Sequence, residues 1–287
     1  MVSTELARSH QKRKNKERLK KLIFYVVLTG LAVIMLIPFA WMLSSSFKMN
    51  RNVFTYPMAW IPDPFVTENY VKIWNEIPLL QFVKNTVKLT VIITVFQVLT
   101  SSFAAYAFAK LNFPGKDILF LSYVITIAIP WQTYMIPQFI IFRNLGLVDT
   151  HWALIILQSF TAFGVFLVRQ FYLGIPNELN EAARIDGLSE YGIYLRIMLP
   201  LSKPVLASLT IFSFVNVWND FMGPLIYIHS TDLKTIQLGL RSFISEYSSE
   251  YSLIMAGAVI ALIPVVIVFL SMQHYFVEGV ATSGLKG

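Results

Sequence analysis

Residues 251–277 read YSLIMAGAVIALIPVVIVFLSMQHYFV and contain no Asp, Glu, Lys or Arg. A helix needs about 20 consecutive apolar residues to cross a bilayer, so this stretch is long enough to span one. A helix also satisfies its own backbone hydrogen bonds, which irregular chain in hydrocarbon does not. The stretch therefore predicts a transmembrane helix.

Five further stretches have the same character. Four of them contain no charged residue and the last has a single one, Asp220; they are 22–47, 89–109, 118–142, 150–168 and 204–231. The chain is 56% hydrophobic and 14% charged, whereas soluble domains are about 45–50% apolar and about 25% charged. We therefore expect an all-α integral membrane bundle of six transmembrane helices. It forms a single domain over 1–287, with a basic cytoplasmic segment at 1–21 and the six helices within 22–287.

The basic residues predict the orientation of this bundle. With the N-terminus inside the cell, that side collects 15 of the 23 Lys and Arg residues. The side richer in Lys and Arg faces the cytoplasm. We thus expect a multi-pass membrane protein with both termini in the cytoplasm. Contact of the basic segment with lipid headgroups explains the net charge of +7 without a nucleic-acid partner.

The residue types argue against chemistry on this chain. Cysteine is absent, and the four His residues are scattered without ligand spacing, so we expect no metal site. No Gly-rich phosphate loop of the Walker type is present. No nucleophile and base stand at a spacing that predicts a catalytic set, so we expect no catalytic residue, no bound cofactor and no enzyme activity of its own.

The largest cytoplasmic loop is expected at 173–202. Pro176 suits the start of a short helix and Gly187 suits its end. Ser189 can cap a second short helix. On the first helix, three small or apolar residues at spacings of three and four share a face: Leu179, Ala182 and Ala183. Such an elbow is suited to dock another protein, although a loop that packs on its own bundle fits the same residues.

The same loop carries a signature. Seven positions of 181–200 match the EAA loop of ABC-importer permeases without a gap: Glu181, Ala182, Ala183, Gly187, Ile197, Leu199 and Pro200. With residue frequencies near 5–10%, such a match arises by chance on the order of 10^-8 times per start point. The chain therefore resembles the permease subunit of an ATP-driven bacterial importer.

That resemblance implies roles for the loop. In the family it is a coupling helix seated in a cleft of an ATPase subunit. By this likeness Glu181 meets a basic group of the ATPase, Ala182 and Ala183 sit in the cleft, and Gly187 allows the bend beside Asp186. ATP and Mg would then be bound by the partner ATPase subunits.

Three other segments resemble carbohydrate importers in particular. Residues 217–225 (VWNDFMGPL) resemble the W-N-(D/E)-F-x-x-P-L segment of their permeases, and 38–48 and 273–287 resemble the smaller permease of maltose-type and multiple-sugar importers. This implies half of a translocation pathway for a carbohydrate, with an oligosaccharide favoured, that works by alternating access. The implied partners are a second homologous permease, two ATPase subunits, an extracytoplasmic sugar-binding protein and membrane lipid.

Polar residues inside the apolar stretches are candidates for the pathway. Asn216, Asn219 and Asp220 share one helical face, which is costly in a membrane unless it meets a partner or a wet cavity. Gln132 and Gln158 are further candidates. The same residues fit a structural reading, in which Asp220 caps or braces a neighbour near the outer interface and the glutamines form interhelical hydrogen bonds.

Other functions predict features that the sequence lacks. An importer of a phosphorylated polyol would favour Lys or Arg inside the spans, and an ion-driven secondary transporter would show inverted repeats and embedded charge relays. A membrane enzyme would need clustered His, Asp or Glu. The sequence leaves open which sugar is carried, whether this subunit contacts it, which outer residues meet the binding protein and whether the ATPase partner is a homodimer.

Overall fold

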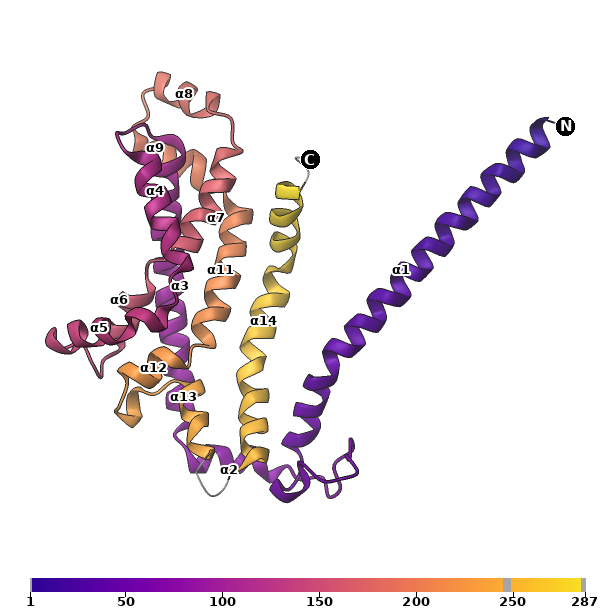
Figure 1. Cartoon of the computed structure of the whole chain (residues 1–287), viewed down its shortest axis with the longest axis vertical. Helices are drawn as coiled ribbons and strands as arrows, with labels where there is room; N and C mark the ends of the chain where they lie inside the picture. Colours follow the sequence, from indigo (N-terminus) through magenta and orange to yellow (C-terminus); the bar gives the residue numbers. More distant parts are fainter. Residues whose placement is uncertain (1, 245–248, 285–287) are drawn as a thin grey trace. The chain divides into compact units, whose positions relative to one another are not determined.

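The computed structural model describes residues 2–244 and 249–284, and this part of the chain is helical, with one isolated bridge between Ile244 and Ser249. Four of its helices are long and apolar enough to cross a membrane, and two bent helix pairs raise that number to six if each pair is one span. The predicted all-α class is confirmed (Figure 1). Five of the six predicted stretches match spans of the higher count, whereas the sixth, 204–231, is matched only as far as Trp218.

The chain divides into two compact units. One comprises 1–72 and 250–259, and the other comprises 73–249 and 260–287. The boundaries fall inside helix α2 (Glu68–Glu76) and helix α14 (Tyr251–Gly284).

The first unit contains the long helix α1 (Val2–Ser46) and the short turn η1 (Asn50–Asn52). Large apolar side chains along α1, such as Phe24 and Met35, are exposed, as expected of a surface that faces lipid. The chain after α1 is fastened by Lys48, whose buried side chain donates to the Ala59 carbonyl at 2.6 Å and lies 3.8 Å from the Trp41 ring centroid.

The second unit is built around helix α3 (Leu79–Lys110), which packs against α7 (Ala162–Leu173) and α11 (Lys203–Trp218). Small residues let these helices approach closely. At Gly164 of α7, an added Cβ would collide with Ser101 Oγ of α3. Two buried apolar clusters result, one around Ile93 and Tyr227 and the other around Tyr106 and Met198.

Two predicted helices are broken. The stretch 204–231 divides into α11, which ends at Trp218, and α12 (Met222–Tyr227), so one continuous helix there was a wrong expectation. The stretch 118–142 is the second. Helix α4 (Lys116–Ile125) continues through η2 (Thr126–Ala128), and the chain then turns by 102° into α5 (Trp131–Asn144), which crosses the direction of α3 (Figure 1). The expectation of one continuous helix over 118–142 is therefore wrong. Pro130 lacks a backbone N–H and disfavours helical geometry at the residue before it, and Ile129 is extended, with φ −85° and ψ 114°.

The remaining helices are short and lie toward the two ends of this unit. Helices α8 (Glu178–Ile185) and α9 (Glu190–Ile193) occupy one end, and α12 (Met222–Tyr227) and α13 (Ile236–Leu240) lie toward the other (Figure 1). The other elements are α6 (His151–Gln158), a π-helical turn η3 (Tyr194–Met198), α10 (Leu199–Leu201), η4 (Thr231–Leu233) and η5 (Arg241–Phe243).

Candidate functional site: a docking helix and a polar cavity

Helix α8 ends as its sequence predicts. It begins at Glu178, two residues after Pro176, and its last residue is Ile185. Gly187 follows with φ +83°, a left-handed conformation that glycine adopts without the strain that a Cβ brings. Ser189 caps α9 by accepting a hydrogen bond from Gly192 N at 3.3 Å. The predicted helix end at Gly187 and the predicted cap at Ser189 are both confirmed.

The two sides of α8 differ in exposure. Asn180 and Ala183 are buried, and Ala183 belongs to the apolar cluster around Tyr106 and Met198. Leu179, Ala182 and Ile185 are exposed, Ile185 to 87%. Leu179, Ala182 and Ala183 therefore do not form a single outward face, because Ala183 packs inward.

The outward side of α8 combines apolar and acidic groups. The apolar residues Leu179, Ala182 and Ile185 are three positions apart and so follow one side of the helix. Glu181 and Asp186 are also exposed. An exposed large apolar side chain ringed by charges is typical of a protein docking surface.

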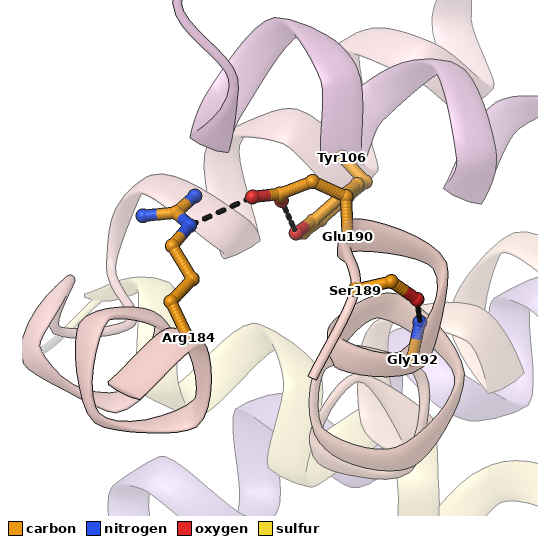
Figure 2. Close-up of polar contacts among 5 residues, drawn as sticks. All are labelled: Tyr106, Arg184, Ser189, Glu190 and Gly192. Carbon is orange, nitrogen blue, oxygen red and sulfur yellow. Dashed lines mark hydrogen bonds and ion pairs between the residues drawn. The ribbon is translucent and has the colours of Figure 1, made fainter. Parts of the chain in front are cut away.

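A polar chain joins α8 to α3. Arg184 Nε donates to Glu190 Oε1 at 2.7 Å, and the hydroxyl of Tyr106 on α3 donates to Glu190 Oε2 at 2.6 Å (Figure 2). The hydrogen bond to Glu190 raises the pKa of Arg184. The sequence analysis missed this chain, because Tyr106 is 84 residues from Glu190 and no periodicity links them.

A second contact fastens the start of α8 to the same helix. Lys110, the last residue of α3, donates to the Ile175 carbonyl at 2.6 Å and to Asn177 Oδ1 at 2.7 Å. Both ends of α8 are therefore held by α3. A force applied to α8 passes into a helix of 32 residues, which at 1.5 Å per residue is long enough to cross a bilayer.

A cavity of about 310 Å³ lies in the same unit, between α3, α5, α6, α11 and α12. The predicted pathway residues Asn216, Asp220 and Gln158 line it. Asp220 accepts from Gln158 Nε2 at 2.7 Å and from Gly223 N at 3.0 Å. The carboxylate thus braces α6 and caps the start of α12, and the same side chain borders the cavity, so the structure accommodates both readings of this residue.

The other two predicted pathway residues lie elsewhere. Asn219 is not among the residues that line the cavity, and it donates to the Val215 carbonyl at 2.9 Å and accepts from Gln237 at 3.3 Å. Helix α11 ends at Trp218, so the helical face expected for Asn216, Asn219 and Asp220 is not continued. Gln132 is exposed and also lies outside this lining.

The sequence analysis missed several lining residues. They are Gln97 on α3 and Trp131, Tyr134 and Gln138 on α5. Trp131 Nε1 donates to Gln138 Oε1 at 2.9 Å. Gln97 and Gln138 stand within apolar stretches, so their polarity was the signal that could have identified them.

At the opposite end of the unit from α8, Asp149 holds the loop after α12. It accepts hydrogen bonds from the backbone N–H groups of His229 and Ser230, each at 2.9 Å, and from the Ser230 hydroxyl. These donors lower the pKa of Asp149 to about 2. No group of three or more His, Asp or Glu residues within the described ranges is placed to hold a metal ion.

Comparisons with known proteins relate the whole chain to transporters. Residues 97–282 match the family described as binding-protein-dependent transport system inner membrane component. The arabinooligosaccharides transport system permease protein AraQ of Halalkalibacterium halodurans is 34% identical over 278 residues, which cover 95% of this chain and 100% of the relative. The lactose transport system permease protein LacG of Rhizobium radiobacter is 30% identical over 272 residues, with coverage of 93% and 97%.

A solved structure supports the fold. A chain from a bacterial ABC transporter involved in the import of the acidic polysaccharide alginate superposes with a TM-score of 0.78. The match covers 91% of this chain and 98% of that one, at 24% sequence identity.

Proposed function

This chain belongs to the family of inner membrane components of binding-protein-dependent transport systems, and on that premise we propose that it is the permease subunit of an ATP-driven carbohydrate importer. Residues 1–287 form one permease domain that supplies half of the translocation pathway. The similarity to permeases for arabinooligosaccharides and lactose along nearly the whole chain supports a sugar, and an oligosaccharide in particular.

The outward side of α8 is the observation that carries this proposal. Its exposed ridge of Leu179, Ala182 and Ile185 docks on an ATPase subunit, and Glu181 and Asp186 meet basic groups there. Gly187 sets the turn that presents the helix. Ala183 contributes from within, by holding α8 against the bundle. ATP and Mg bind on two ATPase subunits, and this chain hydrolyses nothing.

Transport follows an alternating-access cycle. Docking of an extracytoplasmic sugar-binding protein and closure of the ATPase pair open the pathway outward, and hydrolysis resets it inward. The cavity bordered by Asn216, Asp220 and Gln158 lies on this route, and Asn219 and Gln132 flank it. A second, homologous permease completes the pathway in the cytoplasmic membrane, with both termini of this chain in the cytoplasm.

Co-purification tests the proposal. A tagged chain extracted in mild detergent is expected to bring down an ATPase, a second permease and a solute-binding protein, identified by mass spectrometry. Ala182→Asp places a charge on the docking ridge and should lose the ATPase while keeping the second permease. Thr231→Asp, the same kind of change on an exposed residue of η4, is the matched control and should keep both. Recovery of the wild-type chain without any ATPase would contradict the proposal.

A further inference from the structure

We propose that the cavity between α3, α5, α6, α11 and α12 is a subsite of this chain for one neutral sugar ring, and that Asp220 makes it repel sugar acids and phosphates. This inference rests on the proposed carbohydrate transport and adds that this subunit contacts the cargo directly and selects it by charge.

The size and lining of the cavity suit a single ring. At about 310 Å³ it lies at the lower end of the range for small-ligand sites, about 300–1,000 Å³. Trp131 and Tyr134 contribute accessible aromatic rings to its wall, and an aromatic face is an apolar surface on which the C–H face of a sugar can lie. The remaining wall is aliphatic and polar, a mixture that orients a ligand through a few placed polar groups.

The polar groups match sugar hydroxyls. The amide of Gln97 donates to the backbone carbonyl of Gln158 at 2.6 Å, which leaves its carbonyl oxygen as an acceptor. Within the described residues, Asn216 makes no side-chain hydrogen bond although it borders the cavity. An amide offers both donors and acceptors, and a hydroxyl needs both, so these groups can pair with a neutral ring without an ion.

The charge of the lining points the same way. Asp220 is the one acidic residue of the described lining, and none of the lining residues is Lys or Arg. A carboxylate or phosphate on a ligand would meet Asp220 without a compensating cation, and like charges at short range repel. The relative that carries lactose transports a neutral sugar, whereas the relatives for polygalacturonan and sn-glycerol-3-phosphate and the structurally similar alginate transporter carry anionic cargo, so related chains differ in the charge of what they carry.

The absence of cysteine from the chain permits a direct test. A single thiol is introduced as Asn216→Cys in the purified full-length chain, and intact mass follows its reaction with two matched methanethiosulfonates. One carries a glucosyl group and the other a glucuronosyl group, so the rings differ by one negative charge. We expect the glucosyl reagent to react about tenfold faster, within the range that Coulomb's law gives for one charge about 6 Å away.

Variants at Asp220 separate charge from structure. Asp220→Asn should bring the two rates together, whereas Asp220→Glu should keep the preference for the neutral ring. Tyr56→Cys, at a residue that is fully exposed, places a control thiol that should react with both reagents at rates that are independent of Asp220. If Asp220→Asn lowers the melting temperature of the chain, the comparison of the two reagents on Asn216→Cys with Asp220 retained still tests the inference.

Two results would overturn the inference. Equal rates for the two rings in the Asp220 background would refute charge selection. Reaction with small hydroxyethyl methanethiosulfonate but with neither ring would show that the cavity does not admit a sugar. Both results are distinct from a failure of the proposed function, which is judged by the partners that co-purify.

Discussion

Glu190 is the residue whose replacement most directly tests how α8 is held by the bundle. It accepts from both Arg184 and Tyr106, so Glu190→Ala breaks the polar chain between α8 and α3 at its centre (Figure 2). The change also leaves the Tyr106 hydroxyl without its acceptor. Because Tyr106 is only 3% exposed, water does not readily replace that acceptor.

The structure gives the size of the effect. A hydrogen bond to a charged group is worth about 1.5–3 kcal/mol, and that value applies to the part-buried 2.6 Å bond from Tyr106. The ion pair with Arg184 joins side chains that are 41% and 40% exposed, so screening by solvent limits it to about 0.2–1 kcal/mol. We therefore expect Glu190→Ala to lower the free energy of unfolding by about 2–4 kcal/mol.

A double-mutant cycle separates this contact from general damage. Tyr106→Phe removes the donor together with the bond and should cost about 1.5–3 kcal/mol. The Tyr106→Phe, Glu190→Ala double variant should then cost less than the sum of the two single variants by about 1–2 kcal/mol. Unfolding by SDS titration in detergent micelles, followed by tryptophan fluorescence, measures each free energy. Additivity within about 0.5 kcal/mol would refute the coupling between these two residues.

Three further changes test separate features. Asp149→Asn should remove a pH dependence of stability, because the pKa of Asp149 lies at about 2 instead of its ordinary 3.8. The stability that the ionised Asp149 adds is present above about pH 4 and is lost as the pH falls toward 2, so the melting temperature of the wild type should fall relative to that of the variant in this window. Parallel curves of melting temperature against pH would contradict the hydrogen-bond assignment. Gly187→Ala should cost about 1–2 kcal/mol by SDS titration, because the turn requires φ +83°; an unchanged midpoint would mean that the turn adopts another conformation. Gly164→Ala should cost about 1–3 kcal/mol, because its Cβ would collide with Ser101, while Gly30→Ala, where nothing lies within 4 Å, serves as the control and should cost nothing.

Hydropathy predicted the helical class but not the bend after α4. Both sides of Pro130 are apolar, so a hydropathy window reads one span through 118–142. The proline was the available sign, since it disfavours a helix at Ile129. Membrane helices nevertheless often tolerate proline, so the sequence alone did not show whether Pro130 kinks the helix or breaks it.

The signature identified the docking loop, but it did not show which side of α8 is buried and which side is exposed. In a helix of eight residues, spacing groups the residues on a face without saying which face meets the bundle. Ala182 and Ala183 are adjacent and differ in exposure only because the cluster around Tyr106 and Met198 covers Ala183. The tie from Tyr106 to Glu190 depends on tertiary packing and was invisible to any local pattern.

Only part of the polar cavity was predicted, because tertiary structure brings some of its lining residues together. Asn216, Asp220 and Gln158 were identified by the cost of polar groups in apolar stretches, and they do border one cavity. Trp131 and Tyr134 were missed because aromatic residues are abundant throughout the chain and only the bend into α5 brings these two to the cavity.

The most direct test of the central claim is ATP turnover by the purified importer with and without its binding protein, compared between the wild type and Ile185→Asp. Ile185 is 87% exposed on the docking ridge, so a charge there should disturb docking and leave the bundle intact. We expect the variant to lose the stimulation of ATP hydrolysis by the binding protein while the membrane helices stay inserted. Full stimulation in Ile185→Asp would contradict the assignment of α8 as the helix that couples this chain to an ATPase.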